Sequence, residues 1–282
     1  METNSELSRV IFNFTDKCNL PCQFCYIPFD RLKSELNLWK SIITKCKEWH
    51  PQIIVFGGGD PFLYQDFREL LHYSKDDATF INVDTNALAL RSQDVSILKE
   101  CVNQVGLPIE GLEETHTIMR YNPKHFRVVV KWLEILLDAG IRIKINTVVS
   151  KINHHDLKNL ALLLAQYPIS QWCLYQFWPL AIGKENQKLY ALTDKEFLAA
   201  VKPIKENFTF THIDIASISK RLHSHFFVSH TGKVYSDHKD DPEKYVPIGS
   251  IFEEDILRKW RNHGDEYAVS ARARLRIQAY ED

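Results

Sequence analysis

Strand-like apolar segments alternate with amphipathic helix-like segments along residues 9–178, and this alternation predicts an α/β fold. We expect strands near 9–15, 51–56, 79–85, 104–109, 141–149 and 171–178, and helices near 34–49, 64–73, 91–102, 124–139 and 155–166. Helices of crossover length predict a parallel sheet with its helices outside. Spacing alone leaves open a barrel of six such units and a doubly wound sheet.

Four of the expected strands carry polar side chains on one face. Successive side chains of a strand point to opposite faces, so the apolar face can pack on helices while the polar face lines an interior. The expected interior set is Asn13 and Thr15, then Asn82, Asp84 and Asn86, then Gly106, Pro108 and Glu110, then Arg142, Lys144 and Asn146. A closed eight-stranded barrel fills its centre with apolar side chains. The sequence therefore predicts a lumen that holds a polar ligand.

Three cysteines, Cys18, Cys22 and Cys25, follow the first expected strand in a C-x3-C-x2-C spacing. Three thiolates can hold a [4Fe–4S] cluster and leave one iron open for a small molecule. The alternative is a structural zinc site with a distant fourth ligand. Either site would lie at the carboxyl ends of the strands, where ligands gather in parallel α/β folds.

A glycine run, Gly57-Gly58-Gly59-Asp60, follows the second expected strand at the same edge. Glycines let a ligand approach the main chain, and a carboxylate can receive an ammonium group. Together with the segment from Thr15 to Tyr26, this run resembles the radical S-adenosylmethionine (SAM) superfamily. Phe24 stands at the family's aromatic position before the third cysteine, and Gly58-Gly59-Asp60 resembles its Gly-Gly-Glu motif with Asp for Glu.

The resemblance implies a partial (β/α)6 TIM-type barrel in residues 1–180, the radical SAM core, and a C-terminal α+β cap in residues 181–282. It implies one [4Fe–4S] cluster on Cys18, Cys22 and Cys25, with SAM bound to the open iron. The other positions that it implies for SAM are Gly58, Gly59 and Asp60 at the amino group, Arg120 at the carboxylate, Asn86 near the ribose, and Asn146 and Gln176 beside the nucleoside.

The implied activity is reductive cleavage of SAM to a 5′-deoxyadenosyl radical, which abstracts a hydrogen atom from the substrate. The polar lumen favours a small polar metabolite that is nucleotide-, sugar- or natural-product-like, and the charges of Arg142 and Lys144 favour an anionic or multiply hydroxylated one. Glu110, Arg142 and Lys144 are the candidate substrate contacts. The chemistry also implies an electron donor such as flavodoxin or ferredoxin.

Composition and charge narrow the possible partners of the protein and its expected compartment. A chain of 282 residues with a formal net charge of −1 gives no reason to expect nucleic acid or an anionic membrane as partner. Residues 1–8 are polar, so we expect no signal peptide, and no stretch reaches the length of a membrane span. We therefore expect a reducing cytoplasm, in which Cys46, Cys101 and Cys173 are packing residues.

Beyond about residue 180 the alternation fades. We expect a helix over 193–204, a strand near 208–215, a hairpin around Thr231-Gly232 and a helix near 251–262. No cysteine follows Cys173, so we expect no second cluster. This segment also contains several histidines, so a metal or phosphate site remains a less favoured alternative. They are His212, His223, His225, His230 and His238.

Three hypotheses for function remain. Residues 144–149, Trp172 and residues 193–197 are loosely similar to the viperin-like nucleotide dehydratases, although Cys173 stands where those enzymes carry a basic residue. A second hypothesis is maturation of a ribosomally made peptide. The lack of cysteines for an auxiliary cluster counts against it. The third is a noncatalytic iron–sulfur or zinc protein. The glycine run argues against the third, because a sensor needs no pocket for the amino group of SAM.

Overall fold

The computed structural model describes residues 7–14, 17–28, 35–222, 224–238 and 240–263. The strands are β1 (Arg9–Asn13), β2 (Ile53–Gly57), β3 (Phe80–Asp84), β4 (Gln104–Pro108), β5 (Ile143–Val149), β6 (Gln171–Gln176), β7 (His212–Ala216), β8 (Phe227–Ser229), β9 (Lys233–Asp237) and β10 (Tyr245–Ser250). The α-helices are α1 (Leu36–Lys47), α2 (Phe67–Ser74), α3 (Asp94–Cys101), α4 (Glu113–Arg120), α5 (His125–Asp138), α6 (Leu157–Leu164), α7 (Ile182–Glu185), α8 (Gln187–Tyr190), α9 (Asp194–Asn207), α10 (Ile218–Arg221) and α11 (Ile256–Arg261).

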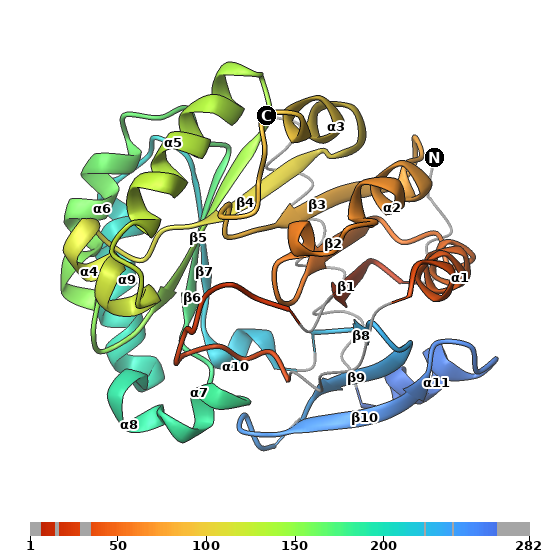
Figure 1. Cartoon of the computed structure of the whole chain (residues 1–282). Helices are drawn as coiled ribbons and strands as arrows, with labels where there is room; N and C mark the ends of the chain where they lie inside the picture. Colours follow the sequence, from red (N-terminus) through yellow and green to blue (C-terminus); the bar gives the residue numbers. More distant parts are fainter. Residues whose placement is uncertain (1–6, 15–16, 29–34, 223, 239, 264–282) are drawn as a thin grey trace.

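All the described strands belong to one curved sheet (Figure 1), in the order β10-β9-β8-β1-β2-β3-β4-β5-β6-β7. The strands from β8 to β7 are parallel, and β9 and β10 extend the sheet with antiparallel pairs. Residues 217–226, which include α10, link β7 to β8 and so join the two edges of the parallel part. The predicted partial barrel with helices outside is confirmed.

The six expected strands of residues 9–178 all form, with ends that differ by a few residues. The expected helices also form, but the segment between β4 and β5 holds two helices instead of one. The additional helix, α4, has Glu113 and Glu114 in its first turn and ends at Tyr121, whose φ of 55° is left-handed. Acidic side chains stabilise a helix N-terminus, so Glu113 and Glu114 could have predicted the start of this helix from the sequence.

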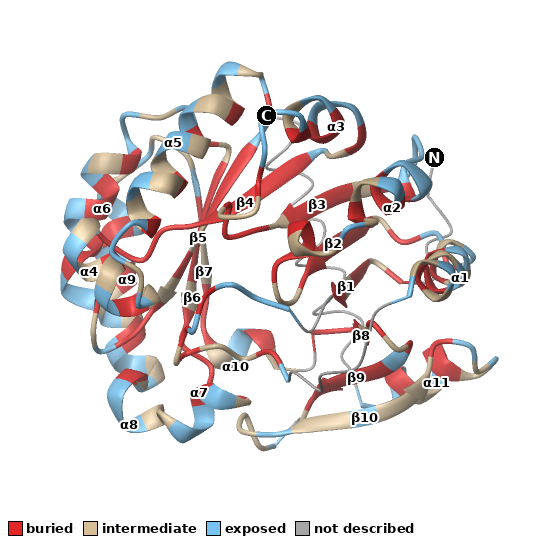
Figure 2. Cartoon of the chain, in the orientation of Figure 1, coloured by how far each residue is buried: buried red, intermediate tan, exposed pale blue. Residues whose placement is uncertain are grey.

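The outer faces of the strands form the main core. Figure 2 shows most residues of the central strands as buried, whereas the surrounding helices also carry exposed residues. Phe12 of β1, Phe14 just after it and Phe56 of β2 meet Trp39 of α1 and Phe67 of α2, with Phe14 stacked on Trp39 at 4.5 Å between ring centroids. Burying each such ring contributes roughly 1.5–3 kcal/mol. The apolar face therefore holds the helices in place and leaves the other face free for polar groups.

The three cysteines outside the C-x3-C-x2-C motif are buried, as expected. Cys46 lies on the buried stripe of α1, Cys101 ends α3, and Cys173 lies in β6. Burial raises the pKa of the Cys46 thiol well above its ordinary range. All three thiols are packed inside the fold.

The C-terminal elements also follow the expectation in outline. A capping box at Thr193 and Glu196 starts α9, and the turn at Gly232, with φ of 78°, joins β8 to β9. Two of the positions named above, Thr15 and His223, lie outside the described residues. Within the described residues, no helix is long and apolar enough to cross a membrane.

Candidate active site

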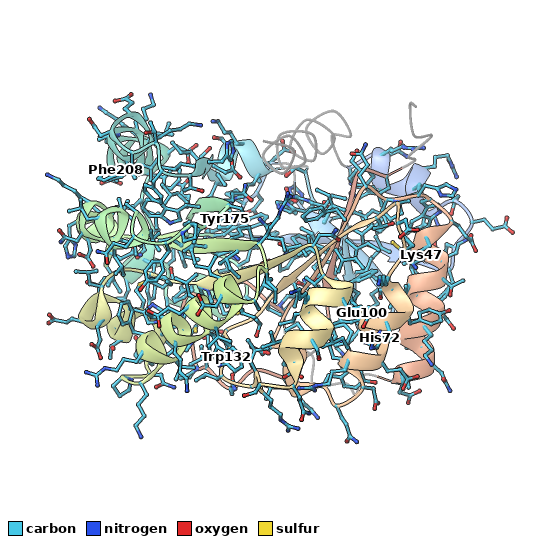
Figure 3. The ribbon with its side chains drawn as sticks, turned by 90° about the horizontal axis from the view of Figure 1, so that it is seen from above. Lys47, His72, Glu100, Trp132, Tyr175 and Phe208 are labelled. Carbon is cyan, nitrogen blue, oxygen red and sulfur yellow. The ribbon has the colours of Figure 1, made fainter. Side chains whose placement is uncertain are left out.

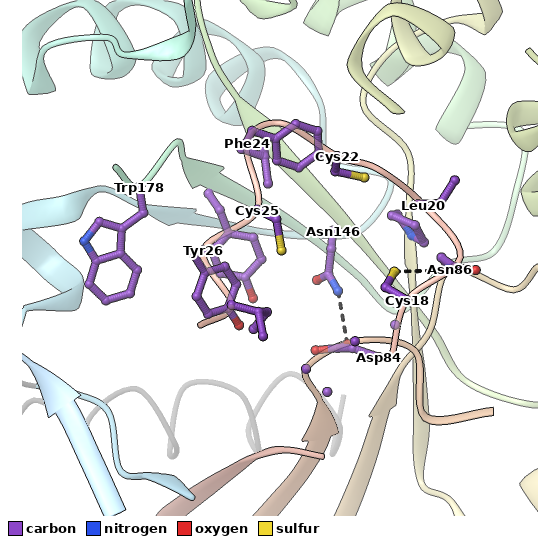
Figure 4. A pocket seen from close by; sticks show the side chains of 18 of the residues that line it. Cys18, Leu20, Cys22, Phe24, Cys25, Tyr26, Asp84, Asn86, Asn146 and Trp178 are labelled. Carbon is purple, nitrogen blue, oxygen red and sulfur yellow. Dashed lines mark hydrogen bonds between the residues drawn. The ribbon is translucent and has the colours of Figure 1, made fainter. Parts of the chain in front are cut away.

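A cavity of about 460 Å³ begins at the carboxyl ends of the parallel strands and continues into the barrel (Figure 4). We call the part that holds Cys18, Cys22 and Cys25 the cysteine end. The polar group deeper in the barrel, here named the interior cluster, consists of Asn82, Asp84, Lys144 and Asn146. A third part, named the arginine wall, consists of Arg9, Trp178, Arg221 and His225. Members of all three sets line the same cavity.

The loop after β1 builds the cysteine end. Its last two cysteines are joined by a turn in which Cys25 N donates to Cys22 O at 3.3 Å. Asn86 Nδ2 donates to Cys18 Sγ at 3.7 Å. Burial raises the pKa of Cys18 and raises that of Cys25 to about 12, and the neighbouring thiols add to both shifts. Binding to a positively charged metal centre would reverse these shifts, because the thiolate is the form that ligates.

The three sulfurs are too far apart to hold one small ion in common. Across the described ranges, the one set of three His, Cys, Asp or Glu ligand atoms within 4.8 Å of one another belongs to His72, Glu100 and Cys101. That set lies on α2 and α3, and Figure 3 labels His72 and Glu100 away from Tyr175 of the pocket. Ligands of a single zinc ion lie within ~4 Å of one another, so the spacing favours a larger cluster over zinc.

The glycine run passes close to the start of the cysteine loop. Gly58 has a φ of 97°, and a Cβ added to it would lie 2.6 Å from Phe14 N. Such a conformation and such an approach both require glycine. Gly57, Gly58 and Gly59 all line the pocket, so their backbone is open to a ligand.

Asp60 differs from its expected placement, because its carboxylate is fully buried and does not line the pocket. Oδ1 accepts from Phe62 N at 3.0 Å, and Oδ2 accepts from Thr85 Oγ1 at 2.9 Å and Asn86 N at 2.8 Å. Burial raises the pKa of Asp60 to about 6, although these donors lower it. Since protein donors occupy both oxygens, the side chain ties the glycine run to the end of β3 and does not receive an ammonium group.

Arg120 comes from α4 and lies at the cysteine end. Its guanidinium donates to Cys22 Sγ at 3.6 Å and lies 5.0 Å from the centroid of the Phe24 ring. It also pairs with the fully buried Glu110. Burial lowers the pKa of Arg120, but Glu110 and Cys22 raise it further, so the net shift is upward.

Glu110 corrects a second expectation. Oε1 pairs with Arg120 and Oε2 accepts from Val148 N at 2.7 Å, so both oxygens have protein partners. The residue has no exposed surface and does not line the pocket. Burial raises its pKa, whereas Arg120 lowers it. Glu110 therefore holds Arg120 in place and is not a substrate contact.

Two buried histidines connect Glu110 to Asn86. Glu110 N donates to His116 Nδ1 at 3.1 Å, so the proton of neutral His116 is on Nε2, which lies 2.8 Å from His125 Nδ1. His125 Nε2 in turn donates to the Asn86 carbonyl at 2.8 Å. Burial lowers the pKa of His116 far below its ordinary value and that of His125 to about 4, and Arg120 adds to both shifts. Both rings are neutral, and each serves as donor and acceptor.

The interior cluster is centred on Asp84. Its Oδ1 accepts from Lys144 Nζ at 2.9 Å, Asn82 Nδ2 at 3.0 Å and Asn146 Nδ2 at 3.1 Å. Gly106 makes room for this arrangement, because a Cβ there would lie 1.9 Å from Asp84 Oδ1. Burial raises the pKa of Asp84, but Lys144 and the amides lower it to a net value below its ordinary range. The predicted polar interior is confirmed for Asp84 and Lys144.

Buried polar atoms without a described partner surround the cluster. They are Asn13 Oδ1, Asn82 Oδ1, Asn146 Oδ1 and both amide atoms of Gln171. A buried polar atom without a hydrogen bond costs about 1–3 kcal/mol. Water or a polar ligand in the cavity can supply partners for atoms of this kind, such as Asn146 Oδ1.

The arginine wall combines cationic and aromatic groups. The Arg221 guanidinium lies 4.7 Å from the centroid of the Trp178 ring and 5.7 Å from that of Tyr175, and it donates to the Gln176 carbonyl. His225 Nδ1 lies 2.9 Å from Asp237 Oδ1. Among the described residues, none of the histidines over 212–238 belongs to a set of three converging ligand atoms.

Most of the other expected site residues line the pocket, and one does not. Those that line it are Asn86, Asn146, Lys144 and Gln176. The Gln176 amide is held by protein at both ends, since Nε2 donates to Leu192 O and Oε1 accepts from Ile218 N. Arg142 is exposed just before β5 and does not line the pocket, so its expected contact with substrate is wrong. A position before the strand begins need not share the strand's interior face.

Several pocket residues were not among the expected site residues. Asp84 was recognised as an interior residue, and its ion pair with Lys144 depends on the register that places β3, β4 and β5 side by side. Arg9 shares the inner face of β1 with Ile11, and that alternation was a usable signal. Arg221 and His225 come from α10 and the loop before β8, for which the sequence offered no periodic pattern.

Comparison with known proteins assigns the chain to a family. Three cysteines above a polar cavity in a partial parallel barrel define a class of barrel enzymes built around a bound cofactor. The sequence model of the radical SAM superfamily matches residues 12–164, more than half of the chain. The chain belongs to the radical SAM superfamily and is an enzyme that uses a [4Fe–4S] cluster and SAM.

Two curated relatives illustrate the range of the similarity. A 24% identical S-adenosylmethionine-dependent nucleotide dehydratase from Selenomonas ruminantium aligns with 94% of this chain and 98% of its own length. A 26% identical Fe-coproporphyrin III synthase from Methanosarcina barkeri aligns with 59% of this chain, which spans only 43% of that protein.

Among solved structures, Streptococcus suis SuiB bound to S-adenosylmethionine matches 96% of this chain and 68% of its own with a TM-score of 0.67 at 16% identity. The native anSMEcpe structure with bound AdoMet matches 93% of this chain and 82% of its own with a TM-score of 0.69 at 17% identity. At these identities the likeness supports the fold.

Proposed function

We propose that Cys18, Cys22 and Cys25 hold the cluster, and that the enzyme acts on a small anionic, hydroxylated metabolite, most specifically a nucleotide. The observation that carries this proposal is that the cysteines share one cavity with the basic side chains of Arg9 and Arg221. Guanidinium groups bind phosphate and carboxylate through paired hydrogen bonds. The nearly full-length similarity to a nucleotide dehydratase supports the choice of a nucleotide.

The residues at the cysteine end suit the two cofactors. Three thiols on one loop match the ligand set of a cluster with one open iron. When bound, the cluster and SAM supply a one-electron cleavage and a 5′-deoxyadenosyl radical that takes hydrogen from the substrate. Arg120 can pair with a carboxylate, and the backbone of Gly58 and Gly59 can accept hydrogen bonds from an amino group.

Asn86, Asn146 and Gln176 remain proposed neighbours of the nucleoside part of SAM. Asn86 is in contact with Cys18, and the buried Asn146 Oδ1 has no partner among the described residues. An acceptor of this kind suits an amino or hydroxyl donor of a nucleoside. Tyr26 stacks with Trp178 at 6.2 Å between ring centroids, and such rings keep water away from the reacting groups.

We propose the division into a core of residues 1–180 and a substrate-side extension of residues 181–282. Arg221, His225 and Phe227 support this division, since they reach the cavity from the C-terminal part. We also propose that a donor such as flavodoxin or ferredoxin delivers the electron, because the cleavage consumes one electron for each SAM.

The direct test uses the anaerobically reconstituted enzyme with SAM and dithionite. We expect 5′-deoxyadenosine to form, and its rate to rise about tenfold or more with at least one member of a panel of ribonucleoside mono-, di- and triphosphates. A reaction without reductant is the control. No response to any ribonucleotide would overturn the choice of substrate class, and a response to a short peptide instead would favour peptide maturation.

A further inference from the structure

We propose that the second carboxylate oxygen of Asp84, Oδ2, is a specificity-determining acceptor that binds a hydroxyl group of the substrate. This inference rests on the proposed function and extends it, because it assigns the interior cluster a chemical task. The cluster holds Asp84 in a single orientation, so that one oxygen is used by the protein and the other is presented to the cavity.

The distribution of donors over the two oxygens carries the argument. Lys144, Asn82 and Asn146 all donate to Oδ1. No donor among the described residues reaches Oδ2. The Asp84 side chain is 33% exposed although it lies inside the barrel, so its exposed part faces the cavity that it lines (Figure 4). A carboxylate oxygen in such a place requires a donor from water or from a ligand.

The charge of the cluster selects the kind of donor. Lys144 is 2% exposed and lies 2.9 Å from Asp84, so the pair is neutral as a unit. An anionic group placed at this point would meet the open carboxylate oxygen and no unpaired cation. A neutral hydroxyl instead donates to Oδ2 at no electrostatic cost. Phosphate or carboxylate of the substrate is thereby directed to the arginine wall, where Arg9 and Arg221 line the same cavity.

Two sources of hydroxyl groups are present in a reaction of this class, the substrate and the ribose of SAM. Asp84 lies two residues before Asn86, the residue that contacts Cys18. Asp84 is the last residue of β3 and Asn86 lies beyond the end of that strand, so Asp84 is the deeper of the two in the barrel, by at most ~7 Å of chain. The depth favours the substrate, and the experiment separates the two sources.

The experiment compares Asp84→Asn with the unchanged enzyme, both reconstituted. The ribonucleotide that most stimulates the unchanged enzyme is the probe, and its 2′-deoxy and 3′-deoxy forms are the matched ligands. We expect Asp84→Asn to raise the KM for the probe about tenfold or more and to change the Kd for SAM less than threefold. For the unchanged enzyme, one of the two deoxy forms should bind more weakly than the probe. For Asp84→Asn, that deoxy form and the probe should bind about equally, because the substitution and the missing hydroxyl remove the same contact.

Asp94→Asn is the matched control, because Asp94 is also a buried carboxylate in an ion pair, with Arg68 at 2.6 Å, and lies outside the pocket. The double variant Asp84→Asn/Lys144→Met removes both charges and guards against misfolding caused by an unpaired lysine. An unchanged probe KM in Asp84→Asn overturns the inference and leaves the proposed function intact. A larger effect on the Kd for SAM than on the probe KM assigns Oδ2 to the ribose of SAM and also overturns it. If no ribonucleotide stimulates the unchanged enzyme, the proposed function fails and the inference with it.

Discussion

Behind the cysteine end of the pocket, the Glu110 carboxylate has protein donors on both oxygens, from Arg120 and from Val148 N. In the interior cluster, the Asp84 carboxylate has three donors on one oxygen and none from the described residues on the other. Both are ion pairs within the barrel, and breaking either leaves a buried charge without its partner. Of the two carboxylates, only that of Asp84 has an oxygen to offer to a ligand.

This difference separates residues that position from residues that bind. Glu110 is fixed through Arg120, Val148 and the histidine pair, and it has no surface in the cavity. Asp84 depends on Gly106 for its space and keeps a third of its side chain open to the cavity. We therefore expect changes at the two sites to affect different measurements, cofactor binding at the first and substrate use at the second.

The largest effect is expected at the cysteines. Cys18→Ala, Cys22→Ala or Cys25→Ala should lower bound iron and sulfide to background and reduce SAM cleavage at least ~1000-fold, because two thiolates do not hold the cluster firmly. Iron, sulfide and 5′-deoxyadenosine are the measurements. Cys101→Ala, which changes a buried thiol on α3, should retain iron. Iron at full content in any of the three motif variants would contradict the assignment of ligands.

The next effect concerns Arg120. Arg120→Met leaves the buried Glu110 charge without its partner, which should lower the free energy of unfolding by about 3–5 kcal/mol. It should also weaken SAM binding about tenfold or more if the guanidinium meets the SAM carboxylate. Chemical denaturation and the Kd for SAM are the measurements.

Arg120→Met/Glu110→Leu is the matched variant, since it removes both charges of the pair. It should recover most of the stability but not the affinity for SAM. Recovery of both would show that Arg120 acts only as the partner of Glu110, and the contrast between the two ends of the pocket would then be lost.

The positions of the six strands and their inner faces could be predicted from the sequence, because both depend on local periodicity. Ile81 and Val83 pack outward and Asp84 points inward, as the alternation of side chains requires. The cysteines and glycines could also be predicted, because each motif lies within one loop at a strand end. Local sequence therefore predicted the cysteine end better than the rest of the pocket.

The remaining features depend on which chain segments become neighbours. The partners of Asp60 are Thr85 and Asn86, which lie on a different strand connection, so the orientation of its carboxylate could not be read from its own motif. Arg221 reaches the cavity because β7 and β8, which flank its segment, lie at opposite edges of the parallel part of the sheet. Long-range pairing of this kind leaves no periodic signal in a single sequence.

A pH titration tests the histidine pair, which belongs to the cysteine end. The pKa of His125 is lowered from 6.5 to about 4, so the folded chain binds fewer protons than the unfolded chain between these values. Its stabilising contribution is complete above pH 6.5 and is lost as the pH falls toward 4, at a cost on the order of 2–3 kcal/mol. Urea unfolding of the metal-free protein over this range measures the loss.

His125→Gln removes the titrating ring and should flatten this part of the stability curve. His155→Gln, which changes an exposed histidine, is the control and should leave the curve as it is. An equal slope in His125→Gln and the unchanged protein would mean that His125 has the same pKa in the folded and the unfolded chain. Burial would then not keep the ring neutral, and the hydrogen-bonded chain from Glu110 N to the Asn86 carbonyl would not hold as described.

The smallest effect on stability is expected from Gly106→Ala, which alters the interior cluster without changing any of its members. The added Cβ would lie 1.9 Å from Asp84 Oδ1 and 2.9 Å from Asn146 Nδ2 and Lys144 Cε, all of them side-chain atoms that can move. Overpacking of this size costs about 1–3 kcal/mol, and the low end fits because no backbone is displaced.

Since Asp84 must turn, we expect the KM for the substrate to rise several-fold while the Kd for SAM stays within about twofold. If Gly106→Ala weakened SAM binding as much as substrate use, the two ends of the pocket would act as one unit, and the distinction between a positioning carboxylate and a binding carboxylate would not hold.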